Sequence, residues 1–282
     1  MSKSLSAAIA VLFVAPLAQA AVNDVYPADY YPLDPGTQLF TLYSADRDVQ
    51  LPHNNTLHMQ TLAVRGSYMT ELWGKTANVM VVLPWVKSSL ELANGVEYQQ
   101  NSAIADLRLG ATIWPINDKI AERYLGLTAT IIPPTGSYDK HRVLNAGENR
   151  WRALLTLGWQ QTLAPKWVFE LSQELAWYGD NTHHSSGLHY QQAATYAATS
   201  YLRYRAHADW HVHLGGQINR GGRISLGGQS QTQTSFQDRV TVGVTWIDPL
   251  KQQWILRVGR DVNNKNTSKT DHEIALRFLK AF

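Results

Sequence analysis

Alternation of apolar and polar residues runs through most of the chain. From Trp151 to Gln160 every second side chain is large or apolar, and the residues between them include Arg152 and Thr156. A period of two is typical of a β-strand whose two faces meet different surroundings. We count about twelve such segments, roughly at residues 36–44, 56–72, 77–90, 102–115, 122–134, 150–162, 166–178, 190–205, 208–218, 238–247, 252–260 and 271–282. The pattern predicts an all-β protein.

The connections between these segments alternate in length. Short turns are expected near residues 74–76, 117–119, 163–165, 206–207 and 248–250, and longer polar loops at 45–55, 91–101, 135–149, 179–189, 219–237 and 261–270. A soluble sandwich gives no reason for this asymmetry, whereas an outer-membrane barrel has short periplasmic turns and long outer loops. Each segment is also long enough for a tilted strand to cross a bilayer. We therefore predict a transmembrane antiparallel barrel of about twelve strands, with both termini on the periplasmic side.

The tryptophans support a membrane setting. Several of the ten lie near segment ends on the apolar face, namely Trp85, Trp151, Trp159, Trp167, Trp177, Trp246 and Trp254. Aromatic girdles mark both interfaces of membrane barrels. A tryptophan-rich soluble core is the alternative, but it does not explain the charges placed opposite these rings.

The last segment carries a signal of its own. Ile274, Leu276, Phe278 and the terminal Phe282 share one face. This resembles the C-terminal signature that the outer-membrane barrel assembly machinery of Gram-negative bacteria reads. Lys280 departs from that pattern, and we expect its long side chain to reach the interface.

The N-terminal residues predict export. Lys3 precedes an apolar run from Leu5 to Leu17, and Ala-Gln-Ala follows at 18–20. This is typical of a signal peptide, residues 1–20, cleaved before a single barrel domain at 21–282. A membrane-anchoring helix is the alternative, but the run is short for a span.

Composition excludes several other classes. There is no cysteine, so neither disulfides nor thiolate metal sites are available. The formal net charge is +3, and its basic residues form no block. Nucleic acid is therefore not an expected partner.

The polar face is expected to point into the barrel, where it carries charges of both signs. Our candidates for the lumen or a constriction are Arg108, Arg152, Glu170, Glu174, Arg203 and Arg257. By the same register Asp106, Arg205, Glu273 and Arg277 also point inward. Two interpretations stay open, since these charges could plug the interior with salt bridges or line a path for a small solute. About twelve strands enclose more space than the eight whose interior side chains can fill.

Residues 126–181 contain a series of short motifs: PTGSY, NAGENRW, KWVFE and GDN. The marked positions in the first two are Pro134, Gly136, Tyr138, Asn145, Gly147, Asn149 and Trp151. The block resembles the family named for the MetA pathway of phenol degradation. The resemblance implies an outer-membrane protein of Gram-negative bacteria with a role in transport, since some members are encoded beside genes for aromatic catabolism. It carries over no catalytic or ligand-binding residue.

The loop from Pro134 to Asn149 is expected to be ordered. Proline restricts the backbone, Tyr138 can anchor the loop, and the amides of Asn145 and Asn149 can bond nearby backbone groups. We predict that the loop packs over Arg152 and narrows the path. The alternative is a cap that only closes the strand pair.

Two histidine patterns have spacings that occur in catalytic or metal sites. His184 and Ser186 have the histidine-x-serine spacing of the outer-membrane phospholipase, but the region after them contains no asparagine or aspartate. His211 and His213 share a strand face and could hold a metal, although a hydrogen-bonded lumenal pair is the simpler interpretation. We therefore predict no enzyme, no catalytic residues, no metal and no other cofactor.

The sequence favours a passive channel for small compounds, aromatic or hydrophobic ones among them, set in outer-membrane lipid. The alternative is a non-transporting surface barrel with a binding or structural role in its outer loops.

Overall fold

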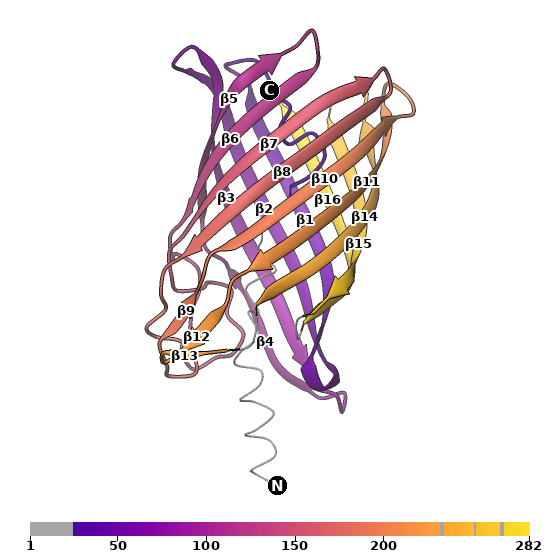
Figure 1. Ribbon diagram of the computed structural model, residues 1–282. Helices are drawn as coiled ribbons and strands as arrows, with labels where there is room; N and C mark the ends of the chain where they lie inside the picture. The colour runs from indigo at the N-terminus through magenta and orange to yellow at the C-terminus, as the bar shows by residue number, and fades with distance from the viewer. Residues whose placement is uncertain (1–24, 232–233, 251, 266–267) are drawn as a thin grey trace.

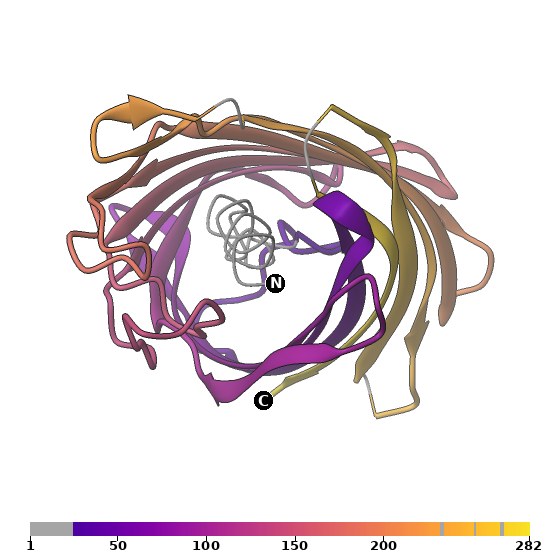
Figure 2. The ribbon, with the colours of Figure 1, turned by 90° about the horizontal axis from the view of Figure 1, so that it is seen from below.

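The computed structural model is a closed antiparallel barrel of tilted strands (Figures 1 and 2). It describes residues 25–231, 234–250, 252–265 and 268–282, so the predicted signal peptide lies outside the described residues. The barrel strands are β1 (Gln38–Leu51), β2 (Asn55–Leu72), β3 (Lys75–Glu91), β4 (Glu97–Ile104), β5 (Arg108–Asp118), β6 (Arg123–Ile132), β7 (Arg152–Ala164), β8 (Trp167–Tyr178), β10 (Thr195–Arg205), β11 (Trp210–Gly221), β14 (Ser235–Ile247), β15 (Gln253–Asn264) and β16 (Lys269–Ala281).

Each barrel strand pairs with its neighbour in chain order, and β1 closes the ring by pairing with β16. Because β4 and β5 are two parts of one interrupted strand, both paired to β3, twelve strands surround the lumen. The predicted fold class and strand number are confirmed.

The remaining elements lie outside the wall. A 3-10 turn, η2 (Pro52–Asn54), joins β1 to β2. A small sheet of β9 (Tyr190–Gln192), β12 (Ile224–Leu226) and β13 (Gln229–Ser230) lies at the end of the barrel opposite the C-terminus (Figure 1). Within the part of the chain that the structure describes, no helix is long and apolar enough to cross a membrane.

The outer face of the wall is apolar, as the alternation predicts. Leu155 and Leu157 are each 40% exposed, while Thr156 between them is 2% exposed and faces inward. Trp167 and Trp210 lie next to the short turns, and Trp151 lies at the other end of the wall. This distribution fits a lipid-facing band with aromatic residues at both edges.

The expected loop lengths are partly wrong. The five short turns are confirmed, and the C-terminus lies at their end of the barrel (Figure 1). Three of the expected long loops are long, at 133–151, 179–194 and 222–234. The other three (45–55, 91–101 and 261–270) are mostly strand, because β1, β3, β4 and β15 continue beyond the apolar band. Polar side chains there resemble a loop in sequence, yet strand pairing continues wherever a neighbouring strand is available.

The wall is interrupted beside β4. β6 ends at Ile132, followed by Pro133 and Pro134, whereas β4 runs on along β3. Proline cannot donate to a ladder, so pairing with β6 stops there. The loop of residues 133–151 covers this edge instead, and Ser137 donates from its amide to the carbonyl of Ile104 at 2.9 Å.

Candidate functional site

The residues before β1, which we call the lumen segment (residues 25–33), run inside the ring of strands (Figure 2). Side chains of the wall hold its backbone. The amide of Ala28 donates to the carboxylate of Glu170 at 2.6 Å, and the indole of Trp114 donates to the carbonyl of Tyr30 at 3.0 Å. Sequence reasoning missed this segment, because nothing in its local pattern says that it enters the barrel.

Charges also anchor the lumen segment. Asp29 accepts a hydrogen bond from Nη1 of Arg277 at 2.5 Å, and the guanidinium of Arg277 lies 5.2 Å from the centre of the Tyr26 ring. Tyr201 donates its hydroxyl to the carbonyl of Val25 at 2.9 Å. Contacts from several strands therefore fix the segment across the lumen.

A pair of glycines makes room for Tyr30. Gly126 and Gly158 are partners across β6 and β7. A Cβ on Gly158 would lie 2.2 Å from three ring atoms of Tyr30, and one on Gly126 would lie 2.8 Å from Cδ1. These distances are far shorter than the contact distance of carbon atoms, so any larger residue would displace the ring.

Beside the lumen segment the barrel holds a cavity of about 300 Å³. Its lining is rich in aromatic and thioether side chains, among them Tyr26, Tyr30, Tyr43, Trp114, Met69 and Met80. Trp114 is 2% exposed and turned inward, unlike the tryptophans at the edges of the lipid-facing band. Charged side chains line it as well, among them Asp29, Arg65 and Arg108. A cavity that combines apolar walls with polar groups at fixed positions is typical of a small-molecule site.

All six candidate lumen residues lie on the inner face of the wall. Arg203 pairs with Glu170 through Nε at 2.8 Å, and Arg152 pairs with Glu148 at 2.8 Å. The hydroxyl of Thr156 donates to Glu174 at 3.2 Å. Arg108 lines the cavity, and Arg257 pairs with Glu273 at 2.7 Å. Their role in a constriction stays a prediction.

Glu273 is the centre of the densest charge cluster. It pairs with Arg257, with Arg239 at 3.0 Å and with Arg47 at a closer approach. Arg47 was missed because residues 45–55 were expected to be a loop, and Arg239 because its strand was predicted from its valines. Salt bridges therefore occupy this part of the interior, and Arg47 of the cluster also lines the cavity, whose other wall residues come mainly from β1–β3 and β5–β7.

Asp106, between β4 and β5, holds the loop of residues 133–151, which carries the family motifs and is called the motif loop below. Its two carboxylate oxygens accept the amides of Gly136 at 2.7 Å and Glu148 at 2.8 Å. Gly136 and Gly147 pack backbone to backbone, and a Cβ on Gly136 would lie 2.7 Å from the carbonyl carbon of Ala105. The two motif glycines are therefore needed for close approach.

Other motif residues also order the loop. The amide of Asn145 donates to the carbonyls of Asp139 and Arg142, as expected, whereas Asn149 donates to the side chain of Asn181 at 3.0 Å. Tyr138 donates to the carbonyl of His183 at 3.0 Å, and Pro134 follows the end of β6. Trp151 is exposed on the outside, at the edge of the lipid-facing band.

Glu148 joins the loop to the barrel mouth. Its oxygens pair with Arg152 at 2.8 Å and Arg150 at 2.6 Å. Burial by itself raises the pKa of Glu148, but the two guanidinium groups outweigh it and hold the pKa below the ordinary value. Asn145 and Ala146 line the cavity, so the loop forms part of its wall. That the loop narrows the path stays a prediction.

The His184 and Ser186 pair is a turn. Nδ1 of His184 lies 2.9 Å from Oγ of Ser186, and it also accepts the amide of Ser186 at 3.3 Å. The ring stacks on Tyr190, and burial together with the charge of Arg150 lowers the pKa of His184. The nearby Asp180 pairs with His189. A serine nucleophile needs a base oriented by a third group, and among the described residues none orients His184.

His211 and His213 point inward without converging. Nδ1 of His211 lies 3.3 Å from Nη1 of Arg203, while His213 packs edge-on against Tyr201. The described residues contain one group of three side chains close enough to share a metal ion, and it lies elsewhere.

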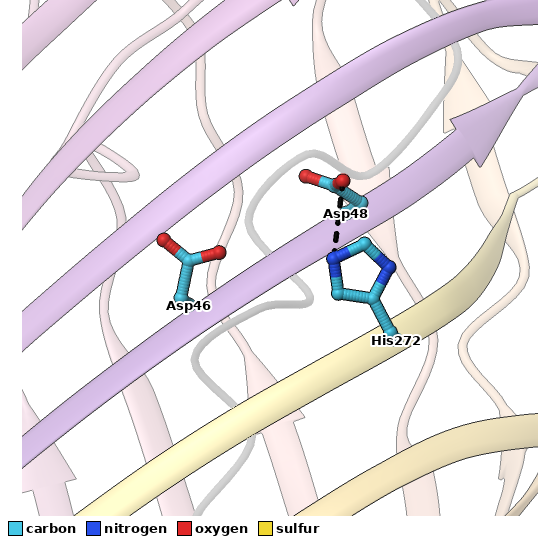
Figure 3. Close-up of side chains that lie close together, drawn as sticks. All are labelled: Asp46, Asp48 and His272. Atoms are coloured by element: carbon cyan, nitrogen blue, oxygen red, sulfur yellow. Dashed lines mark ion pairs between the residues drawn. The ribbon is translucent and has the colours of Figure 1, made fainter.

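That group consists of Asp46, Asp48 and His272, on the outer surface of β1 and β16 (Figure 3). Nε2 of His272 lies 3.2 Å from Asp48, which also contacts His58 at 2.5 Å. Asp46 accepts a hydrogen bond from Gln60 at 3.0 Å. The partners within the protein account for this exposed ion-pair cluster, which adjacent strands assemble and local sequence does not reveal.

Comparison with solved structures defines the class. The crystal structure of the COG4313 outer membrane channel from Pseudomonas putida F1 is 24% identical, with a TM-score of 0.86 over 92% of this chain and 100% of that chain. The beta domain of the Bordetella autotransporter BrkA is 11% identical, with a TM-score of 0.53 over 88% of this chain and 100% of that chain. The TodX deltaS2S3 mutant monoaromatic hydrocarbon channel is 12% identical, with a TM-score of 0.52 over 89% of this chain and 91% of that one. The fold is that of outer-membrane barrels.

A family model places the chain more specifically than the fold does. The model of the family described as "Putative MetA-pathway of phenol degradation" matches residues 41–278, and the chain belongs to that family. The match spans nearly the whole barrel, far more than the motif block at 126–181. Among curated proteins, none matches this chain.

Proposed function

We propose that this barrel lies in the outer membrane of a Gram-negative bacterium and passively conducts small aromatic or hydrophobic compounds. The cavity beside the lumen segment carries the proposal, because tyrosine, tryptophan and methionine side chains line it. Such side chains favour planar aromatic and apolar groups over sugars. Membership of the phenol-degradation family agrees with this class of solute.

Two sequence signals support delivery to that membrane. Residues 1–20 would direct export, and the last strand, β16, with Phe282 directly after it, would be read by the barrel assembly machinery. Lys280 lies 4.8 Å from the centre of the Phe282 ring, so an aromatic neighbour accompanies its charge at the chain end.

Solute influx tests the proposal. The barrel is reconstituted into liposomes with lipopolysaccharide in the outer leaflet, because a plain phospholipid bilayer is itself permeable to small hydrophobic compounds. We expect phenol and toluene to enter faster than into protein-free liposomes, and a disaccharide to enter no faster. Equal influx with and without protein would favour the non-transporting surface barrel.

A further inference from the structure

The charged side chains around the cavity differ in how many hydrogen-bond and ion-pair partners they have within the protein. Three carboxylates line it, and each already has its partners: Asp29, Asp106 and Glu148. Both oxygens of Asp106 accept backbone amides, and both oxygens of Glu148 meet arginines. The carboxylates of the cavity are therefore engaged within the protein.

Arg65 of β2 is the contrasting case. Its nearest carboxylate is Asp29, at 3.9 Å from Nη2, but Asp29 already accepts Arg277 at 2.5 Å and the amide of Tyr26 at 2.8 Å. Nε of Arg65 has no hydrogen-bond partner, and the guanidinium lies 5.4 Å from the centre of the Tyr43 ring. A cation with so little compensation in a largely buried place favours an anion beside it.

The position of Arg65 also matters. Its guanidinium lies at the cavity among the aromatic side chains already described, so an anionic group placed there would have an aromatic wall around the rest of its molecule. A guanidinium binds a carboxylate through two parallel hydrogen bonds, which fixes the orientation of the ligand as well as its charge.

We infer that Arg65 anchors the carboxylate of an aromatic acid whose ring lies against Tyr30, Tyr43 and Trp114. This deepens the proposed function, on which it rests, by assigning the solute class to aromatic carboxylates. Uncharged aromatics enter the same cavity and lack the anchor.

Binding of benzoate and benzamide tests the inference, because the two probes differ mainly in charge. Each radiolabelled probe is dialysed against the barrel in lipid nanodiscs, with empty nanodiscs subtracted. We expect benzoate to bind about tenfold more tightly, as charge-assisted hydrogen bonds usually allow. Arg65→Gln should remove that preference and leave benzamide binding unchanged, and Arg65→Lys should retain part of it. Arg123→Gln, at the exposed start of β6 and outside the cavity, is the matched control and should change nothing.

Three outcomes decide whether the inference on Arg65 holds. A benzoate preference that is lost in Arg65→Gln and weakened by salt in the unaltered barrel supports the inference. Equal binding of both probes to the unaltered barrel overturns it and leaves the proposed function standing. Failure of both probes to bind, with the barrel folded, overturns the inference, and absence of phenol and toluene influx in the liposome assay then separately overturns the proposed function. If Arg65→Gln does not fold, the probe comparison and the Arg65→Lys variant still decide.

Discussion

Gly158→Ala should loosen the lumen segment from its place. The new methyl would lie 2.2 Å from three atoms of the Tyr30 ring, whereas carbon atoms in contact lie about 3.5–4.0 Å apart, so the ring must retreat by roughly 1.5 Å. These atoms lie at the base of the ring, close to the backbone of the lumen segment. Hydrogen bonds with Trp114 and Glu170 hold that backbone in place, so the segment cannot shift freely. Overpacking of this kind costs about 1–3 kcal/mol.

That cost falls on the state in which the segment is lodged in the lumen. It corresponds to a shift of roughly 5- to 150-fold in the equilibrium between lodged and released states. We expect a higher mean single-channel conductance in planar bilayers and faster proteolysis within residues 25–33. Gly216→Ala is the control, because its Cβ would lie 3.9 Å from Oγ of Ser200, an ordinary contact. A folded Gly158→Ala barrel with unaltered conductance and protease resistance would refute the reasoning.

Three further predictions concern the wall and the motif loop. Leu155→Arg places a charge in the lipid-facing band and should lower the free energy of unfolding by about 2–4 kcal/mol in urea titrations. Thr61 faces the cavity, so Thr61→Arg should lower it much less. Equal losses would mean that the faces are assigned wrongly. Replacing residues 137–147 by a Gly-Ser linker should raise conductance with folding intact if the loop narrows the path, and an unchanged conductance would leave it a cap. The folded-state pKa of Glu148 is lowered, so its stabilisation of the loop is complete above its ordinary value of 4.5 and is lost as the pH falls below it. Amide exchange in the loop should therefore accelerate in acid, and this pH dependence should be smaller in Glu148→Gln, where Asp106 is the remaining carboxylate bonded to loop amides.

The sequence by itself determined the architecture of the wall. A two-residue period is a local property, so the strand faces, the lipid-facing leucines such as Leu155 and the inward charges such as Arg203 follow directly from it. The strand number and antiparallel order follow from the same period together with the short turns. Strand ends such as residues 46–51 of β1 were missed, because beyond the lipid both faces can be polar and the alternation fades.

The tertiary structure decided what fills the interior. Arg47 and Glu273 are 226 residues apart in the chain and meet only because β1 closes the ring against β16. The lumen segment has no period of its own, and its place depends on groups as distant as Glu170 and on the space above Gly158. A local pattern reports which face a side chain takes, whereas ring closure, with its long-range pairing, sets which side chains share the lumen and where a cavity remains.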